Sequence, residues 1–260
     1  MEYSFTILGS GTSYGVPIIG CHCPTCTSKD PRDNRTRAAG WFHGNGVSII
    51  FDVGADLRAQ AIREDICDID AVFLTHNHAD HINGIDDLRG FTKRSKGDLP
   101  FYAREFDVEY IRKCFAYMFN YNVPKERIWD LPHLILTAVD TEPVVVKNIS
   151  VLPIPIIHGE TEIRGYRMGD FAYLTDCSSI PESSYPLLKG VRNIVIDGLH
   201  RRPHLTHFNF EGAIAATAPI GADNVYLTHI SHEICHAVDD PTLPPGIHIA
   251  YDGLTIPVEA

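Results

Sequence analysis

The stretch Thr75-His76-Asn77-His78-Ala79-Asp80-His81 decides how this chain is interpreted. It directly follows the apolar run Ala71-Val72-Phe73-Leu74, which has the composition of a buried strand. Imidazole and carboxylate groups are ligands that divalent zinc, manganese and iron accept. A solvated turn rich in histidine would account for one or two of these side chains, but not for four in six residues. The stretch therefore predicts a metal site at the end of a core strand.

The composition indicates a folded protein without a large basic surface. The 260 residues are 44% hydrophobic, and the formal net charge is -11, from 22 Lys and Arg against 33 Asp and Glu. That charge disfavours a nucleic-acid polymer as partner, whereas bound divalent cations would still make a site locally positive for a small anionic substrate. Apolar runs stay well short of about 18 residues, and the N-terminus lacks the features of a signal peptide. We therefore expect a cytoplasmic protein that does not contact membranes.

Residues 20–39 are polar and lack a hydrophobic period, which predicts a surface loop within one domain spanning residues 1–260. Three thiols of this loop are closely spaced: Cys21, Cys23 and Cys26. Their spacing allows them to surround one structural zinc ion, although a closed site needs a fourth ligand. The candidates for that ligand are His22, His232 and His236. The alternative is a set of ordinary reduced thiols.

Helical segments are expected on either side of the His-rich stretch. Residues 55–64 have a helix-favouring composition, and residues 82–90 resemble a short helix. Residues 92–134 combine a basic patch with many aromatic side chains. We expect this segment to be a helical insertion that closes over the fold and walls the pocket or forms a homodimer contact.

Five apolar runs end on a histidine or an aspartate. These runs are Val72-Phe73-Leu74-Thr75-His76, Ile154-Pro155-Ile156-Ile157-His158, Ala172-Tyr173-Leu174-Thr175-Asp176, Asn193-Ile194-Val195-Ile196-Asp197 and Val225-Tyr226-Leu227-Thr228-His229. Buried strands that end in polar residues place those residues on one rim of a sheet. Six or seven such ligands are too many for one tetrahedral zinc and suit two metals that share a carboxylate. Asp52, which ends another apolar run, is expected to support a ligand from behind.

The order of these ligands resembles a known pattern. His-Asn-His-Ala-Asp-His at 76–81, followed by His158, Asp176 and His229, is similar to the His-x-His-x-Asp-His … His … Asp … His pattern of the metallo-β-lactamase superfamily. The resemblance implies an αββα sandwich with its metal site at one edge. It implies two divalent metal ions, zinc or manganese with iron as a further option. The implied ligands are His76, His78 and His158 for the first metal, Asp80, His81 and His229 for the second, and Asp176 as the bridge.

Two further segments resemble one subgroup of that superfamily. Gly9-Ser10-Gly11-Thr12-Ser13 followed by the Cys loop is similar to the PhnP-type phosphodiesterases of the carbon-phosphorus lyase pathway. In those enzymes the loop binds a structural zinc, and the resemblance implies His232 as its fourth ligand. Residues 203–213 resemble the segment of PhnP and tRNase Z that supplies a catalytic histidine. His207 matches that position, with His204 as its nearest competitor and a helix cap as the alternative role for His207.

Together these features predict a metal-dependent phosphodiesterase that acts on small or cyclic phosphate diesters. A hydroxide held by both metals would attack phosphorus, Asp80 would orient it, and His207 would assist departure of the leaving group. An Asp bridge, rather than a Cys, points to this side of the superfamily. The alternatives are tRNA 3′ processing, which the acidic charge disfavours, hydrolysis of a thioester or lactone, and a non-catalytic metal-binding module like the PqqB proteins of pyrroloquinoline-quinone biosynthesis.

Overall fold

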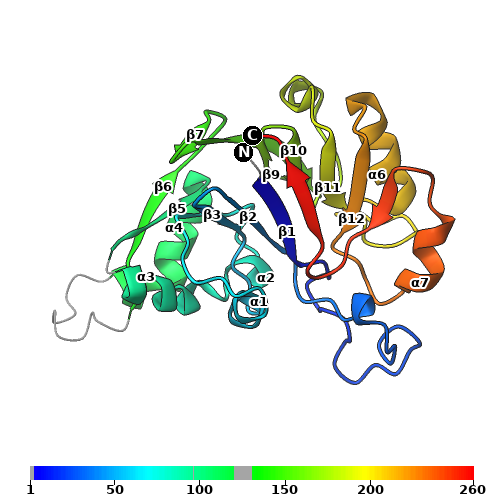
Figure 1. Ribbon diagram of the computed structural model, residues 1–260, viewed down its shortest axis with the longest axis horizontal. Helices are drawn as coiled ribbons and strands as arrows, with labels where there is room; N and C mark the ends of the chain where they lie inside the picture. The colour runs from blue at the N-terminus through cyan, green and yellow to red at the C-terminus, as the bar shows by residue number, and fades with distance from the viewer. Residues whose placement is uncertain (1–2, 96, 120–130) are drawn as a thin grey trace.

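Two seven-stranded β-sheets form the centre of the computed structural model, which describes residues 3–95, 97–119 and 131–260 (Figure 1). The strands of the first sheet are, in spatial order, β14 (Thr255–Val258), β1 (Tyr3–Gly9), β2 (Ala39–Gly44), β3 (Val47–Phe51), β4 (Ala71–Phe73), β5 (Leu99–Ala103) and β6 (Leu134–Ala138). Those of the second are β13 (Ile247–Ile249), β12 (Asn224–Thr228), β11 (Asn193–Asp197), β10 (Phe171–Leu174), β9 (Thr161–Met168), β8 (Ile149–His158) and β7 (Val144–Val146).

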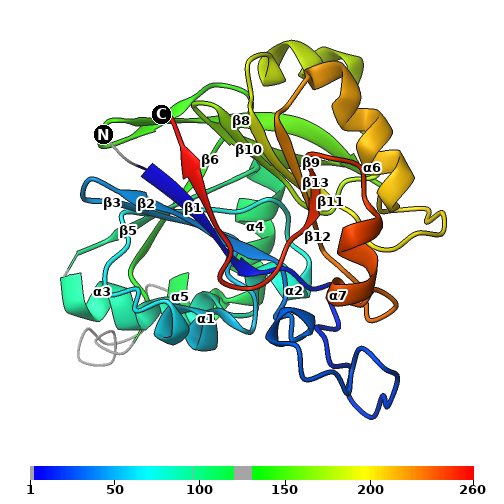
Figure 2. The same ribbon diagram turned by 45° about the vertical axis from the view of Figure 1, so that its right-hand side comes forward.

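Helices lie on the outer side of each sheet (Figures 1 and 2). On the side of the first sheet are α1 (Leu57–Arg63), α2 (Ala79–Ile82), α3 (Arg89–Ser95), α4 (Glu105–Cys114) and α5 (Ala116–Phe119). On the side of the second are α6 (Phe210–Thr217) and α7 (His236–Asp239). The arrangement is the four-layer αββα sandwich, which confirms the predicted fold class.

Several central strands, such as β3, β4, β10 and β11, are apolar on both faces because each sheet is covered on both sides. In β3, Ile49 and Phe51 point into the core between the sheets, whereas Ile50 packs in the cluster under the helices. Phe5 of the first sheet stacks on Phe171 of the second, with 4.3 Å between the ring centroids. This double burial explains why these segments read in the sequence as continuous apolar runs without a polar alternation.

Parallel pairing brings the ligand-bearing strand ends together. In the first sheet β3, β4, β5 and β6 run parallel, and in the second β10, β11, β12 and β13 do. Their carboxyl ends therefore lie at one edge of each sheet. The polar residues that follow the strands converge at this edge of the sandwich, as the sequence predicted.

The segment 92–134 differs from the expected helical insertion. Only α4, α5 and the end of α3 are helical in its described part, and residues 120–130 lie outside the described residues. Leu99, Phe101 and Ala103 are buried in alternation along β5, which pairs with β4 and β6. The aromatic side chain at 101 thus belongs to a strand of the first sheet, so residues 99–103 are not part of the expected helical insertion. The expected helix at 82–90 is likewise divided between α2, a 3-10 turn at Ile85–Leu88 and α3.

Candidate active site and metal centres

The first cluster at the sheet edge contains three histidines. His76 and His78 follow β4, and His158 ends β8; one ligand atom of each lies within 4.8 Å of the others. His158 Nδ1 lies 2.7 Å from the carbonyl oxygen of Thr206, and as a donor to it leaves Nε2 with a free lone pair. His76 Nδ1 lies 3.0 Å from Thr75 Oγ1, while its buried Nε2 has no hydrogen-bond partner among the described residues. The cluster thus presents imidazole nitrogens to a common point.

The second cluster contains two carboxylates and two histidines: Asp80, His81, Asp176 and His229. Asp176 stands between the imidazoles, because its Oδ2 lies 3.2 Å from His81 Nε2 and its Oδ1 lies 3.3 Å from His229 Nε2. Asp80 Oδ2 lies 3.4 Å from His81 Nε2. Asp176 also groups with His158 and His207 within 4.8 Å, so it lies between the two clusters. This is the position that a bridging carboxylate requires.

Asp52 holds one member of the second cluster, His81, in place. Its Oδ2 lies 2.9 Å from His81 Nδ1, and its Oδ1 accepts hydrogen bonds from the backbone N–H and the hydroxyl of Thr75 at 2.9 and 3.0 Å. Both the carboxylate and the imidazole are fully buried. Asp52 therefore fixes the orientation of His81 and the turn that carries His76.

Three residues of this edge adopt a left-handed backbone conformation that side chains rarely take. The φ angles are 62° at Asp52, 55° at Asp176 and 58° at His229. Each residue directly follows a strand or lies within two residues of its end. The conformation turns the chain sharply, and such outliers often mark functional sites.

The charges of the second cluster depend on one another. Burial opposes ionisation of Asp176, but His229 and His81 outweigh it and hold its pKa well below the usual range. Burial likewise opposes protonation of His229, yet Asp176 and Asp80 raise its pKa to about 9. The protein by itself thus balances its buried carboxylates with imidazolium protons. Divalent cations placed among these groups would take over that role.

His207 lies beside both clusters and is held by a buried aspartate. Its Nδ1 lies 2.6 Å from Asp197 Oδ2, and the Asp197 side chain is fully buried at the end of β11. Burial, together with His229, lowers the pKa of His207 to about 4, so its imidazole is neutral at pH 7. His204 is exposed, and its Nδ1 accepts a 3.3 Å hydrogen bond from the backbone N–H of Thr206. Of the two candidates, His207 is the one that the structure brings to the ligand clusters.

A separate cluster joins the Cys loop to the chain after β12. Cys21, Cys23 and Cys26 surround His232, whose Nδ1 lies 3.3, 3.5 and 3.6 Å from the three sulfurs. A hydrogen bond from the backbone N–H of Cys26 lowers the pKa of Cys23 to about 7, which favours a thiolate. His22 is exposed, and His236 is buried elsewhere with its backbone N–H bonded to Asp33. The geometry suits the tetrahedral zinc site expected for this loop.

The sequence did not reveal what anchors the loop. Its last part is not a surface segment, because Arg35 is fully buried and paired with buried Asp33 at 3.0 Å. Arg35 Nη1 donates to the carbonyl oxygen of Ile234 at 3.0 Å, and Asp33 Oδ1 accepts the backbone N–H of His236 at 2.8 Å. This pair ties the loop to residues 229–236, which carry His229 and His232. We call these residues the shared segment.

Comparisons with known proteins show which family this chain belongs to. Residues 48–230 match the family described as beta-lactamase superfamily domain. The chain belongs to the metallo-β-lactamase superfamily. It is similar to a crystal structure described as a new diphosphatase from the PhnP family, at 39% identity, with a TM-score of 0.92, over 99% of this chain and 98% of that one. This confirms the predicted PhnP-like subgroup.

Two further proteins are similar to this chain. Zn(2+)-bound PqqB from Methylobacterium extorquens is 19% identical with a TM-score of 0.78, over 97% of this chain and 99% of that one, which shows a common fold. A curated protein of Porphyromonas gingivalis (strain ATCC BAA-308 / W83), named octanoyltransferase, is 39% identical over 252 residues. The match covers 95% of this chain but only 50% of that protein, so the chain spans about half the length of this relative.

The residues at the sheet edge fit the divalent metals that the superfamily binds. The fit rests on the convergence of nitrogen and carboxylate ligands and on the buried Nε2 of His76, which has no hydrogen-bond partner among the described residues. Across the described part of this superfamily member, no helix is sufficiently long and apolar to traverse a membrane.

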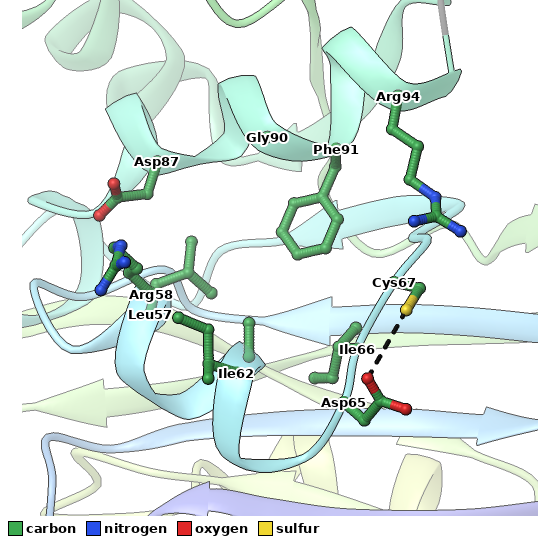
Figure 3. A pocket seen from close by; sticks show the side chains of 11 residues that line it. Leu57, Arg58, Ile62, Asp65, Ile66, Cys67, Asp87, Gly90, Phe91 and Arg94 are labelled. Carbon is green, nitrogen blue, oxygen red and sulfur yellow. Dashed lines mark hydrogen bonds between the residues drawn. The ribbon is translucent and has the colours of Figure 1, made fainter.

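A cavity of about 380 Å³ lies away from this edge, between α1 and the helices that follow α2 (Figure 3). Leu57 and Ile62 from α1 and Phe91 from the facing α3 give it apolar walls, and Arg58 and Asp87 face each other at one end. No residue of the metal-ligating clusters lines it. It therefore lies apart from the candidate metal centres.

Proposed function

We propose that this chain is a metal-dependent phosphodiesterase that hydrolyses small or cyclic phosphate diesters. The observation that carries the proposal is the placement of the His207–Asp197 pair beside two ligand clusters that meet at Asp176. A protein that only binds metal would not need a histidine that a buried aspartate holds beside the metal ligands. The similarity to a PhnP-family diphosphatase, at 39% identity, also supports phosphate chemistry.

The proposed metal ligands are divided between two positions. His76, His78 and His158 would hold the first ion, Asp80, His81 and His229 the second, and Asp176 both. Bound zinc or manganese would polarise a phosphoryl oxygen and lower the pKa of a water molecule. A third zinc ion, with a structural role, would be held by Cys21, Cys23, Cys26 and His232.

The chain's own residues would position the substrate and move a proton. Asp197 holds Nδ1 of His207, so Nε2 of the neutral imidazole is the nitrogen that would take up a proton and pass it to the leaving group. Asp80, half-buried at the rim of the second cluster, accepts a hydrogen bond from the attacking water and orients it. The hydrogen bond from Nδ1 of the His158 side chain to the carbonyl oxygen of Thr206 ties the segment that carries His207 to the first cluster.

The decisive experiment is turnover of bis(p-nitrophenyl) phosphate by protein stripped of metal and then restored with zinc or with manganese. We expect turnover only after metal is restored. His207→Ala should lower kcat by about 100- to 10,000-fold with the metal content unchanged, because general acid-base catalysis contributes that much. His204→Ala should lower kcat far less, since its imidazole lies outside the ligand clusters.

The control is His133→Ala, which removes an exposed histidine directly before β6. His133 belongs to none of the ligand clusters, so turnover should be unchanged. Metal content of every variant is measured by plasma mass spectrometry. Full metal content without turnover of this diester with either metal would reject the phosphodiesterase proposal and direct attention to thioesters, lactones or a non-catalytic role.

A further inference from the structure

Asp197 uses only one of its two carboxylate oxygens to hold His207. Oδ2 lies 2.6 Å from His207 Nδ1, whereas Oδ1 is buried and has no hydrogen-bond partner among the described residues. The whole side chain is shielded from solvent at the end of β11. A buried carboxylate oxygen is costly to leave without a donor, so a second partner is expected for it.

The second ligand cluster contains a buried nitrogen that also lacks a partner. His229 Nδ1 makes no hydrogen bond in the described part of the chain. One ligand atom from each of Asp197, His207 and His229 lies within 4.8 Å of the others. His229 Nε2 is turned toward Asp176, 3.3 Å from its Oδ1, so Nδ1 is the ring nitrogen left for another partner. Two unpaired polar atoms, an oxygen and a nitrogen, therefore lie in one buried cluster.

Strand pairing fixes these groups relative to one another. Asp197 and Thr228 are paired residues of the parallel strands β11 and β12, and His229 directly follows Thr228. The backbone N–H of Gly198 donates to the carbonyl oxygen of Thr228 at 2.9 Å, which holds the two strand ends together. The rings of His207 and His229 stack, with centroids 4.6 Å apart and an angle of 13° between their planes. Asp197 therefore lies beside both imidazoles on a rigid part of the fold.

The proton of His229 has one place when Nε2 binds a metal ion. The neutral imidazole then carries its proton on Nδ1. Histidines that bind metal usually donate this second N–H to a carboxylate, a carbonyl oxygen or water, which orients the ring and strengthens its hold on the metal. Resting on the proposed function above, we propose that Asp197 is a positioning residue for two histidines at once. Oδ2 accepts a hydrogen bond from His207 Nδ1, and Oδ1 accepts one from the metal ligand His229 through its Nδ1.

The hydroxyl of Thr228 is the competing partner for Oδ1. Thr228 Oγ1 is buried without a hydrogen-bond partner among the described residues. As the strand partner of Asp197, Thr228 directs its side chain to the same face of the sheet. A metal-bound imidazole carries part of the charge of the cation, which strengthens its N–H bond to a carboxylate, whereas a hydroxyl has no such charge. The two alternatives predict different effects on metal affinity.

The test is the zinc affinity of three proteins: the wild type, Asp197→Asn and His207→Ala. Each is stripped of metal and titrated with zinc against a chromophoric chelator, and circular dichroism verifies its fold. The Cys loop is the same in all three, so differences in affinity report on the sheet edge. Asp197→Asn should bind zinc about 10- to 100-fold more weakly, because loss of the partner of a ligating histidine typically has that effect. His207→Ala should bind zinc like the wild type, since it leaves both Asp197 and His229 in place.

Two further measurements separate the alternatives. Thr228→Val removes the hydroxyl, keeps the shape of the side chain and should leave zinc affinity unchanged. In the zinc-loaded wild type with ¹⁵N-labelled histidine, NMR should show a proton on His229 Nδ1 that exchanges slowly with water. This second measurement needs no substitution at Asp197, so it tests the contact even if that variant does not fold.

Three results would overturn the inference while the phosphodiesterase function stands. These are unchanged zinc affinity in Asp197→Asn, an equal loss of affinity in His207→Ala or Thr228→Val, and a His229 that carries its proton on Nε2. Absence of metal-dependent turnover in the wild type would instead reject the proposed function. The zinc affinities and the NMR signal would in that case still decide whether Asp197 holds His229.

Discussion

Replacing Asp33 by Asn should destabilise the fold through a single lost charge. Asp33 Oδ1 accepts both the bond from Arg35 Nη2 and the bond from the backbone N–H of His236, at 3.0 and 2.8 Å. An asparagine with its carbonyl oxygen in that place keeps both bonds. Its amide group would then face Cys235, whose sulfur lies 3.6 Å from Oδ2 in the wild type. The substitution therefore leaves the guanidinium of Arg35 buried without a counter-ion and changes little else.

The size of the effect follows from burial. The side chains of Arg35 and Asp33 are 0% and 1% exposed, and removal of one partner from such a pair typically costs about 3–5 kcal/mol. Because the two hydrogen bonds remain, we expect a loss near the lower limit, about 3 kcal/mol. At about 2–4 °C per kcal/mol for a chain of this size, the thermal midpoint should fall by roughly 10 °C. Urea unfolding followed by circular dichroism measures the free energy directly.

Two further variants test whether the uncompensated charge is the cause. Asp33→Asn combined with Arg35→Met removes both charges, and this double variant should lie within about 2 kcal/mol of the wild type, the remainder being the lost bond to Ile234. Asp223→Asn breaks an exposed pair with Arg192 and should leave the midpoint unchanged. A loss below about 1 kcal/mol in Asp33→Asn, or a double variant less stable than the single one, would refute this reasoning.

Three other predictions concern the turn that carries Asp80, the pH dependence of stability and the Cys loop. A Cβ at Gly54 would lie 1.9 Å from the Asp80 carbonyl oxygen, so Gly54→Ala should displace that turn and lower diester turnover about 100-fold. A Cβ at Gly90 would have no atom within 4 Å, so Gly90→Ala should leave turnover unchanged. Burial lowers the pKa of His43 from 6.5, so the unfolded chain binds the proton more readily and stability falls as pH drops below that value. Urea unfolding at about pH 8 and about pH 5.5 should show a smaller fall in His43→Gln, and an equal fall would contradict the assignment. Cys23→Ser should abolish binding of the structural zinc and lower the thermal midpoint, as metal analysis and calorimetry would show; retention of that zinc would exclude a ligand role.

The sheet edge could be predicted from the sequence because local signals determine it. A buried parallel strand is apolar on both faces, so a histidine or aspartate just after its end is conspicuous, as at Asp176 and His229. The pairing of Ile196 with Leu227 and of Ile50 with Val72 then places the ends of neighbouring strands side by side. The convergence of the ligands needs only the strand pattern and the direction of the strands.

Contacts between distant residues could not be predicted in the same way. Nothing near Asp33 or Arg35 in the sequence indicates that they are buried against the shared segment, about 200 residues later. Asp197 was visible as a strand end, but its contact with His207 depends on the path of the chain between them. The strand β5 was missed because a short run with Pro100 and aromatic residues does not distinguish a strand from a helix.

The left-handed residues Asp52, Asp176 and His229 have a consequence for protein engineering. For an ordinary side chain this conformation costs on the order of 1 kcal/mol, and glycine or asparagine adopts it more readily. A library screened for thermal stability alone would therefore enrich glycine or asparagine at these three positions. Such variants would retain the sandwich but lose two proposed metal ligands, Asp176 and His229, and the carboxylate of Asp52 that holds His81. Selection for stability at this edge would therefore reduce metal binding unless metal content is screened as well.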